Sequence, residues 1–86
     1  MLYKTHETVT YTRTAIKALA KMPKRDSAAI QKKMANYAAG GTEDVRPLQG
    51  SDLYRLRHGD WRAIFDQAGE VIEVVKVASR GEVYRR

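Results

Sequence analysis

The chain contains no cysteine, so it has neither a disulfide nor a thiol nucleophile. Its two histidines, His6 and His58, are far apart in the sequence, which excludes the usual zinc sites built from cysteine and histidine. No run of about 18 apolar residues predicts a membrane span, and the first residues lack the pattern of a signal peptide. We therefore expect a cytoplasmic protein that needs no metal or other cofactor and does not enter a membrane.

The chain also lacks the short motifs of the common enzyme classes. It has no G-x-S-x-G nucleophile elbow, no glycine-rich phosphate loop ahead of a helix and no H-E-x-x-H metal motif. Any catalysis must therefore depend on a cluster of residues that folding brings together.

Arginine is abundant, and it is distributed unevenly. The net charge of +6 and the pI of about 9.8 favour an acidic partner, either nucleic acid or an acidic protein. Residues 1–43 carry eight basic side chains, six of them lysine, whereas residues 44–86 carry eight of which seven are arginine. A guanidinium group is a rigid fork of donors that fits phosphate. The second half is therefore the favoured place for an anion site.

The first half of the chain predicts one strand and two helices. Residues 2–11 are rich in threonine, valine and tyrosine and contain no glycine or proline, which is typical of a strand. Thr12 or Thr14 can cap a helix by accepting a backbone N–H bond, and Pro23 ends that helix and begins the next. The second helix is expected to reach about Ala39, just before a pair of glycines.

The second half predicts a loop and then three strands. Residues 40–52 contain three glycines and a proline and are expected to form a loop. Residues 53–57, 61–66 and 71–78 are expected to be strands separated by glycine-containing turns. We predict one domain, residues 1–86, of the α+β class. Its order is β-α-α-β-β-β, with an antiparallel meander sheet and a helical hairpin packed on one face.

Alternation along the predicted strands gathers arginines. Arg55 and Arg57 share one face of their strand, and Arg62 on the next strand joins them if the apolar neighbours face the helices. Arg80 follows the last strand and can approach the same face from the end of the sheet. The pattern leaves two interpretations open, a solvated sheet face or a site that holds phosphate.

His58 is expected in the turn beside these arginines. An imidazole titrates at about pH 6.5 and is suited to general acid or base catalysis. A histidine is also an ordinary turn residue. The sequence leaves both interpretations open.

Two segments carry a resemblance to a known family. "VRPLQGSDLYRLRHGDWRAIFD" (residues 45–66) and "VIEVVKVASRGEVYRR" (residues 71–86) resemble the RelE/ParE toxins of type II toxin–antitoxin modules. The first half agrees with the family only in pattern and length. The resemblance implies the compact RelE-like fold, whose order is the one predicted above. It also implies one of two activities: the RelE branch cuts mRNA in the ribosomal A site, and the ParE branch poisons DNA gyrase.

The resemblance to the nuclease branch assigns roles to individual residues. Paired basic residues on the family's second strand match Arg55 and Arg57, and an arginine on the third strand matches Arg62. A basic residue after the last strand and a tyrosine near the C-terminus match Arg80 and Tyr84. The expected catalytic residues are Arg62, Arg80, Tyr84 and His58, and the expected RNA-binding residues are Arg55, Arg57, Arg46 and Arg85.

The implied reaction is metal-independent, because the 2′-hydroxyl of the RNA attacks the adjacent phosphate. Arginines would stabilise the charge that grows on the phosphate oxygens. The sequence departs from many relatives, since Ala78 and Ser79 stand where a histidine or lysine precedes the arginine. Arginine cannot surrender a proton near neutral pH. Tyr84 is therefore expected to take the 2′-proton or to stack on a base, and His58 is the reserve acid or base.

The resemblance also implies the partners. A nuclease toxin of this kind acts on mRNA in the ribosome and is held inactive by a cognate antitoxin, a small acidic protein whose segment folds on contact. Toxin and antitoxin could form a hetero-oligomer that reaches operator DNA through the antitoxin. Two alternatives are a ParE-like gyrase inhibitor and a family member that only binds its antitoxin.

Overall fold

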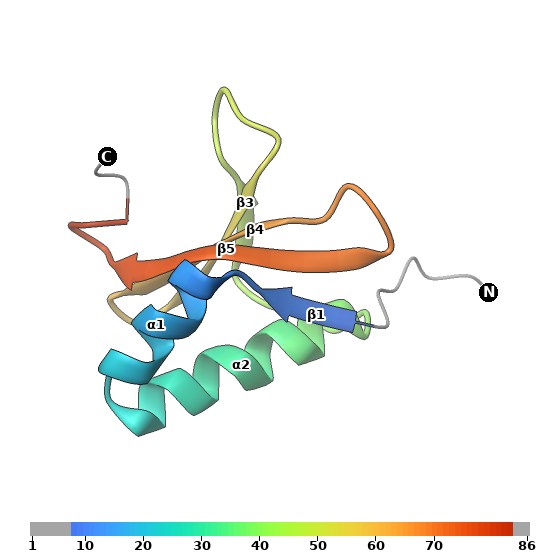
Figure 1. Cartoon of the computed structure of the whole chain (residues 1–86). Coiled ribbons are helices and arrows are strands. Elements are labelled where there is room, and N and C mark those ends of the chain that lie inside the picture. Colours follow the sequence, from blue (N-terminus) through green and yellow to red (C-terminus); the bar gives the residue numbers. More distant parts are fainter. Residues whose placement is uncertain (1–7, 84–86) are drawn as a thin grey trace.

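The structure, a computed structural model, describes residues 8–83 as an α+β fold with one five-stranded sheet. The strand order is β1-β5-β4-β3-β2; β1 runs parallel to β5, and the other neighbours are antiparallel. Both helices lie on the same side of the sheet (Figure 1). In chain order the elements are β1 Thr8–Tyr11, α1 Arg13–Lys21, α2 Lys24–Ala38, β2 Val45–Pro47, β3 Tyr54–His58, β4 Trp61–Asp66 and β5 Val71–Ser79.

This architecture confirms the predicted class, the helical hairpin on one sheet face and the antiparallel meander, which is β3, β4 and β5. One element was not predicted. The segment 40–52, expected to be a loop, contains the short strand β2, which pairs with β3. Three residues are too few to show alternation, and Pro47 lacks a backbone N–H, which is tolerated because β2 is an edge strand. Of the predicted first strand, residues 2–7 lie outside the described part of the chain.

Thr12 links the first helix to the sheet. Its hydroxyl oxygen accepts a hydrogen bond from the backbone N of Ala15 at 3.2 Å, which caps α1 as predicted. The same hydroxyl donates to the carbonyl of Val75 at 3.0 Å, and the backbone N of Thr12 donates to the carbonyl of Val74 at 2.9 Å. These contacts fix the start of α1 against β5.

A β-bulge in β5 keeps the helix side of the sheet apolar. Ile64 pairs with Lys76 and Phe65 pairs with Val74, so Val75 is an extra residue in β5. The insertion puts both Val74 and Val77 in the core under the helices. The buried core comprises Ala15, Leu19, Met22, Ile30, Met34, Ala38, Leu56, Ala63, Phe65, Ile72, Val74 and Val77.

Aromatic rings extend this core. Tyr54 stacks on Phe65 with ring centroids 5.9 Å apart, and Tyr37 meets Phe65 edge-on at 5.5 Å. Trp61 packs against the same core. Tyr54, Leu56 and Phe65 thus hold the β3–β4 hairpin on the helices, which leaves the alternate positions of both strands on the opposite face.

Candidate nucleic-acid interface

Four arginines lie together on the sheet face away from the helices. Arg57 is directly opposite Arg62 in the β3–β4 ladder, and Arg46 is directly opposite Arg55 in the β2–β3 ladder. The prediction that Arg55, Arg57 and Arg62 share a face is confirmed. Arg46, which the sequence left in a loop, joins them through the unpredicted strand β2. We call this set the arginine face: Arg46, Arg55, Arg57 and Arg62.

A single carboxylate lies between two of these arginines. Oδ1 of Asp44 is 3.6 Å from Nη1 of Arg55 and 4.0 Å from Nε of Arg46. The side chain of Arg55 is 17% exposed and that of Arg46 is 74% exposed. Nη1 of Arg55 is buried and has no hydrogen-bond acceptor among the described residues, because 3.6 Å is an ionic contact and is too long for a hydrogen bond.

Arg62 is held by the turn that precedes it. Its Nη1 donates to the carbonyl of Gly59 at 2.9 Å and to the carbonyl of Trp61 at 3.0 Å. Gly59 has a φ of 56°, a conformation that glycine adopts without strain and that closes this tight turn. The guanidinium group of Arg62 is therefore positioned beside the β3–β4 turn before any ligand binds.

Arg80 lies at the same end of the sheet. Its backbone N donates to the carbonyl of Asp60, in the β3–β4 turn, at 2.6 Å. The ladder partner of Arg62 on β5 is Ala78, two residues before Arg80. The backbone of Arg80 thus follows the end of the sheet that carries Arg57 and Arg62, and its side chain is exposed. Tyr84 and Arg85 lie outside the described residues, and their expected roles stay predictions.

His58 lies on the other side of the sheet. It is the last residue of β3 and shares the face of Leu56, so it points toward the helices rather than the arginines. Its Nε2 is 3.0 Å from Oδ1 of Asp26 on α2, and the two side chains are 21% and 25% exposed. The expected position of His58 beside the arginines is wrong, because β3 continues one residue further than the sequence indicated.

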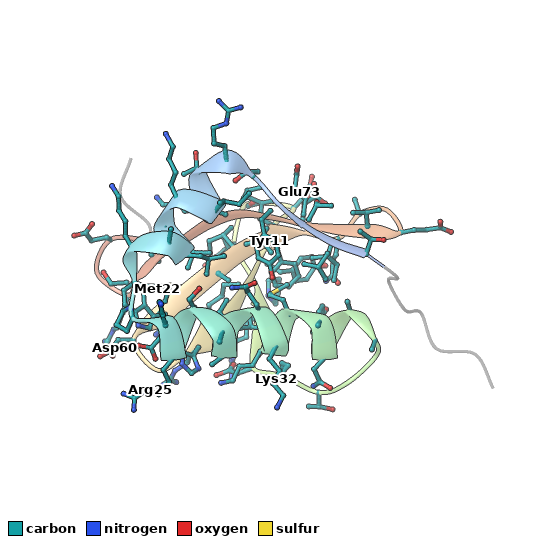
Figure 2. The ribbon with its side chains drawn as sticks, turned by 60° about the horizontal axis from the view of Figure 1, so that its bottom comes forward. Tyr11, Met22, Arg25, Lys32, Asp60 and Glu73 are labelled. Carbon is teal, nitrogen blue, oxygen red and sulfur yellow. The ribbon has the colours of Figure 1, made fainter. Side chains whose placement is uncertain are left out.

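Asp26 escaped the sequence interpretation because it is 32 residues from His58 and belongs to a different element. Figure 2 shows Asp60 of the hairpin turn and Arg25 of α2, which are sequence neighbours of the pair, at the same end of the molecule. Nδ1 of His58 is buried and has no hydrogen-bond partner among the described residues. The pair therefore ties the hairpin to α2.

A cavity of about 700 Å³ lies away from the arginine face, between the end of α2 and the loops around β3 and β4. It contains no basic side chain, and the Tyr37 hydroxyl donates to Oε1 of Gln67 at 2.8 Å in its wall. The lining residues are Tyr37, Gly40, Gly41, Pro47, Ser51, Asp52, Tyr54, Asp66, Gln67 and Ala68. It is therefore distinct from the predicted phosphate site.

Within residues 8–83, no three histidine, aspartate or glutamate side chains are grouped closely enough to hold a metal ion. No helix in that same part of the chain is long and apolar enough to cross a membrane.

Comparisons with known proteins identify relatives of the whole fold. Residues 9–84 match the family model described as the ParE toxin of the type II toxin–antitoxin system parDE. No curated protein sequence matches the chain significantly. The family match spans every described strand and helix except the first residue of β1.

Several solved structures share the fold. A chain of the RelB–RelE antitoxin–toxin complex from Methanococcus jannaschii is 21% identical, with a TM-score of 0.72 over 88% of this chain and 95% of that chain. A chain of the RelE–RelB complex from Pyrococcus horikoshii OT3 is 27% identical, with a TM-score of 0.66 and coverages of 93% and 99%. YafQ from E. coli strain BL21(DE3) is 16% identical, with a TM-score of 0.71 and coverages of 88% and 96%.

Proposed function

Because this chain belongs to the ParE toxin family, and so to the RelE/ParE toxins of type II toxin–antitoxin modules, we propose that it is a ribosome-dependent mRNA endoribonuclease. The arginine face is the observation that supports this choice. Four arginines on adjacent strands, with Arg57 opposite Arg62, gather donor groups whose fork geometry suits phosphate.

The proposed reaction is attack of the RNA 2′-hydroxyl oxygen on the adjacent phosphorus. The P–O5′ bond breaks, a 2′,3′-cyclic phosphate forms, and the 5′-oxygen leaves with a proton. Arg62 and Arg80 would stabilise the negative charge that grows on the phosphate oxygens. Arg55 and Arg57 would orient the backbone so that the 2′-oxygen lies in line with the leaving group. The guanidinium group of Arg62 is already fixed by two carbonyl oxygens, which lowers the cost of ordering it.

In this proposal Tyr84 takes the proton of the 2′-hydroxyl and supplies the proton with which the 5′-oxygen leaves. Arginine does not give up its proton, and His58 is directed toward α2, where Asp26 binds it. We therefore give His58 a positioning role in the hairpin rather than the acid–base role. A site with arginines and one tyrosine would be weak on free RNA, which fits a requirement for the ribosome to position the substrate.

The proposed partners follow from the same assignment. Several solved relatives are toxin–antitoxin complexes, and we propose that a small acidic antitoxin binds this basic chain. Such a segment would order on contact. Any contact with operator DNA would be made through the antitoxin in a hetero-oligomer, and the site of action would be the cytoplasm.

A gyrase inhibitor is the second candidate, and the match to the ParE family model favours it. The two candidates separate in one experiment with the purified chain. One arm contains ribosomes programmed with a defined mRNA, and new RNA 5′-ends are mapped by primer extension. The other arm contains DNA gyrase and supercoiled plasmid, and double-strand breaks are measured. We expect mRNA ends inside the A site and intact plasmid; intact mRNA with gyrase-dependent breaks would overturn the proposal.

A chain that does neither, and still binds its antitoxin, would be the non-catalytic alternative. Growth arrest on expression without the antitoxin distinguishes that outcome, because a chain that only binds antitoxin does not arrest growth.

A further inference from the structure

Asp44 is built into the arginine face. Its backbone carbonyl accepts a hydrogen bond from the backbone N of Arg57 at 3.0 Å, which extends the β2–β3 ladder by one position. Alternation along β2 puts Asp44 and Arg46 on the same face of the sheet. The carboxylate is thus held among the arginines by the backbone and does not reach them from a flexible loop.

The surroundings of Arg55 show what this carboxylate does. The guanidinium group is mostly covered, at 17% exposure of the side chain, and its Nη1 finds no hydrogen-bond acceptor among residues 8–83. A buried charge without a partner is unfavourable. Asp44 supplies the nearest negative charge at 3.6 Å but not a hydrogen bond. Nη1 of Arg55 therefore has a counter-charge nearby, but its N–H groups still lack a hydrogen-bond acceptor.

Asp44 is also the sole carboxylate in this position. In the part of the chain that the structure describes, no other aspartate or glutamate lies within 4.0 Å of an arginine nitrogen. The other acids of this sheet face, Asp66 and Glu73, occupy opposite positions in the β4–β5 ladder, at the far end of the strands.

We propose that Asp44 is an internal competitor of phosphate on the arginine face. In the free protein its carboxylate is the counter-charge of Arg55 and Arg46. When RNA binds, the carboxylate moves away, a phosphate group contacts these two arginines, and Nη1 of Arg55 donates a hydrogen bond to a phosphate oxygen. Arginine binds carboxylate and phosphate with the same fork of donors, so the exchange needs no rearrangement of the strands. The ligand being RNA rests on the proposed function, whereas the competition with phosphate rests on the contacts above.

The competition has a consequence for specificity. A phosphate of free RNA must displace the Asp44 carboxylate against the repulsion between the two negative charges. The binding of free RNA is therefore weakened. An RNA held in place by the ribosome loses less translational and rotational entropy on binding, and this saving offsets the electrostatic cost of displacing the carboxylate. Asp44 is therefore a positioning residue that lowers the affinity of the face for unpositioned RNA.

The test compares Asp44→Asn with the matched control Glu70→Gln, which removes the same charge from an exposed turn residue. Binding of a labelled RNA oligonucleotide with 2′-O-methyl groups, which cannot be cleaved, is followed by fluorescence anisotropy at several salt concentrations. We expect Asp44→Asn to bind roughly three- to tenfold more tightly than wild type and Glu70→Gln less than twofold more tightly. Equal effects of the two variants would overturn the proposal, because the gain would then reflect net charge alone.

A second measurement uses pyrophosphate and thermal unfolding. In phosphate-free buffer Asp44→Asn should melt at a lower temperature than wild type, since Arg55 loses its counter-charge. Pyrophosphate should restore the melting temperature of the variant and should raise that of wild type by less. A variant that pyrophosphate does not rescue contradicts the proposal. Asp44→Ser serves in the same assay if the asparagine variant does not fold.

These readouts do not depend on cleavage. Tighter binding by Asp44→Asn without mRNA cutting by any variant would leave the competition standing and remove the nuclease function. mRNA cleavage by wild type, with RNA affinity unchanged in Asp44→Asn, would support the nuclease function and overturn the competition.

Discussion

Arg57 and Arg62 face each other directly across the β3–β4 ladder. Like charges at such a position are unfavourable for the sheet, and the bonds that Arg62 makes to the carbonyls of Gly59 and Trp61 turn its guanidinium group back over the turn. Two arginines at facing positions of a ladder are expected where an anionic ligand supplies the opposite charge. The pair is therefore the strongest structural mark of the proposed site.

Replacing Arg57 by threonine should stabilise the free protein. The repulsion from Arg62 disappears and a β-branched residue enters a strand, so we expect the free energy of unfolding to rise by about 0.5 kcal/mol at low salt. The gain should shrink in high salt, where exposed charges are screened. Urea denaturation at two salt concentrations measures this. An unchanged or lower stability of the variant at low salt would contradict the repulsion between the two arginines.

The contact between His58 and Asp26 should contribute to stability. The two side chains are about three-quarters buried and 3.0 Å apart, so His58→Ala or Asp26→Ala should lower the free energy of unfolding by about 1–3 kcal/mol. The two substitutions should be non-additive by about 1 kcal/mol in a double-mutant cycle. Additive losses would mean that the two residues act independently.

The same variant tests the position of His58 relative to the chemistry. His58→Ala, assayed below its unfolding temperature, should keep mRNA cleavage within a few-fold of wild type because the imidazole lies on the helix side of the sheet. A loss of about 100-fold in a folded protein would return His58 to the acid–base role.

Thr12 should matter more than its neighbour Thr14. Thr12→Ala removes the cap of α1 and the bond to Val75 in β5, and should cost about 1–2 kcal/mol of stability. Thr14 is exposed on the first turn of α1, so Thr14→Ala is the matched control and should cost less than about 0.5 kcal/mol. Similar losses in both variants, measured by thermal or urea unfolding, would refute the double role of Thr12.

Tyr11 should make the protein sensitive to alkaline pH. Burial raises the pKa of Tyr11 above its ordinary value of 10.0, so the folded protein holds the phenolic proton more tightly than the unfolded chain. This contribution is fully present below pH 10.0 and is lost as the pH rises through the raised folded pKa. The stability of wild type should therefore fall relative to that of Tyr11→Phe in urea titrations from about pH 9 to pH 11. A stability difference between wild type and Tyr11→Phe that does not change with pH would contradict this prediction.

Much of the site was predictable because it depends on local alternation. The spacing of Arg55 and Arg57, with a tight turn before Arg62, determines their common face once the apolar neighbours are buried. Arg46 was not placed there because a strand of three residues that ends in Pro47 leaves no periodic signal.

The partners of these residues could not be predicted. Asp26 and Asp44 are set by the packing of α2 on the sheet and by the register of β2, and neither is visible in a local pattern. His58 was misplaced because it was assigned to the turn; as the last residue of β3 it follows the alternation of Tyr54 and Leu56 and therefore faces the helices.

We propose that the arginine face, together with Arg80 and Tyr84, cuts mRNA on the ribosome. The most direct test is primer extension on programmed ribosomes with wild type, Arg62→Ala, the double variant Arg80→Ala with Tyr84→Phe, and the control Arg25→Ala, whose arginine lies on α2. Circular dichroism and antitoxin binding show that each variant is folded. We predict A-site cleavage by wild type and Arg25→Ala, and a loss of about 100-fold or more in the other two. Cleavage at the wild-type rate by folded Arg62→Ala and by the double variant would contradict the account.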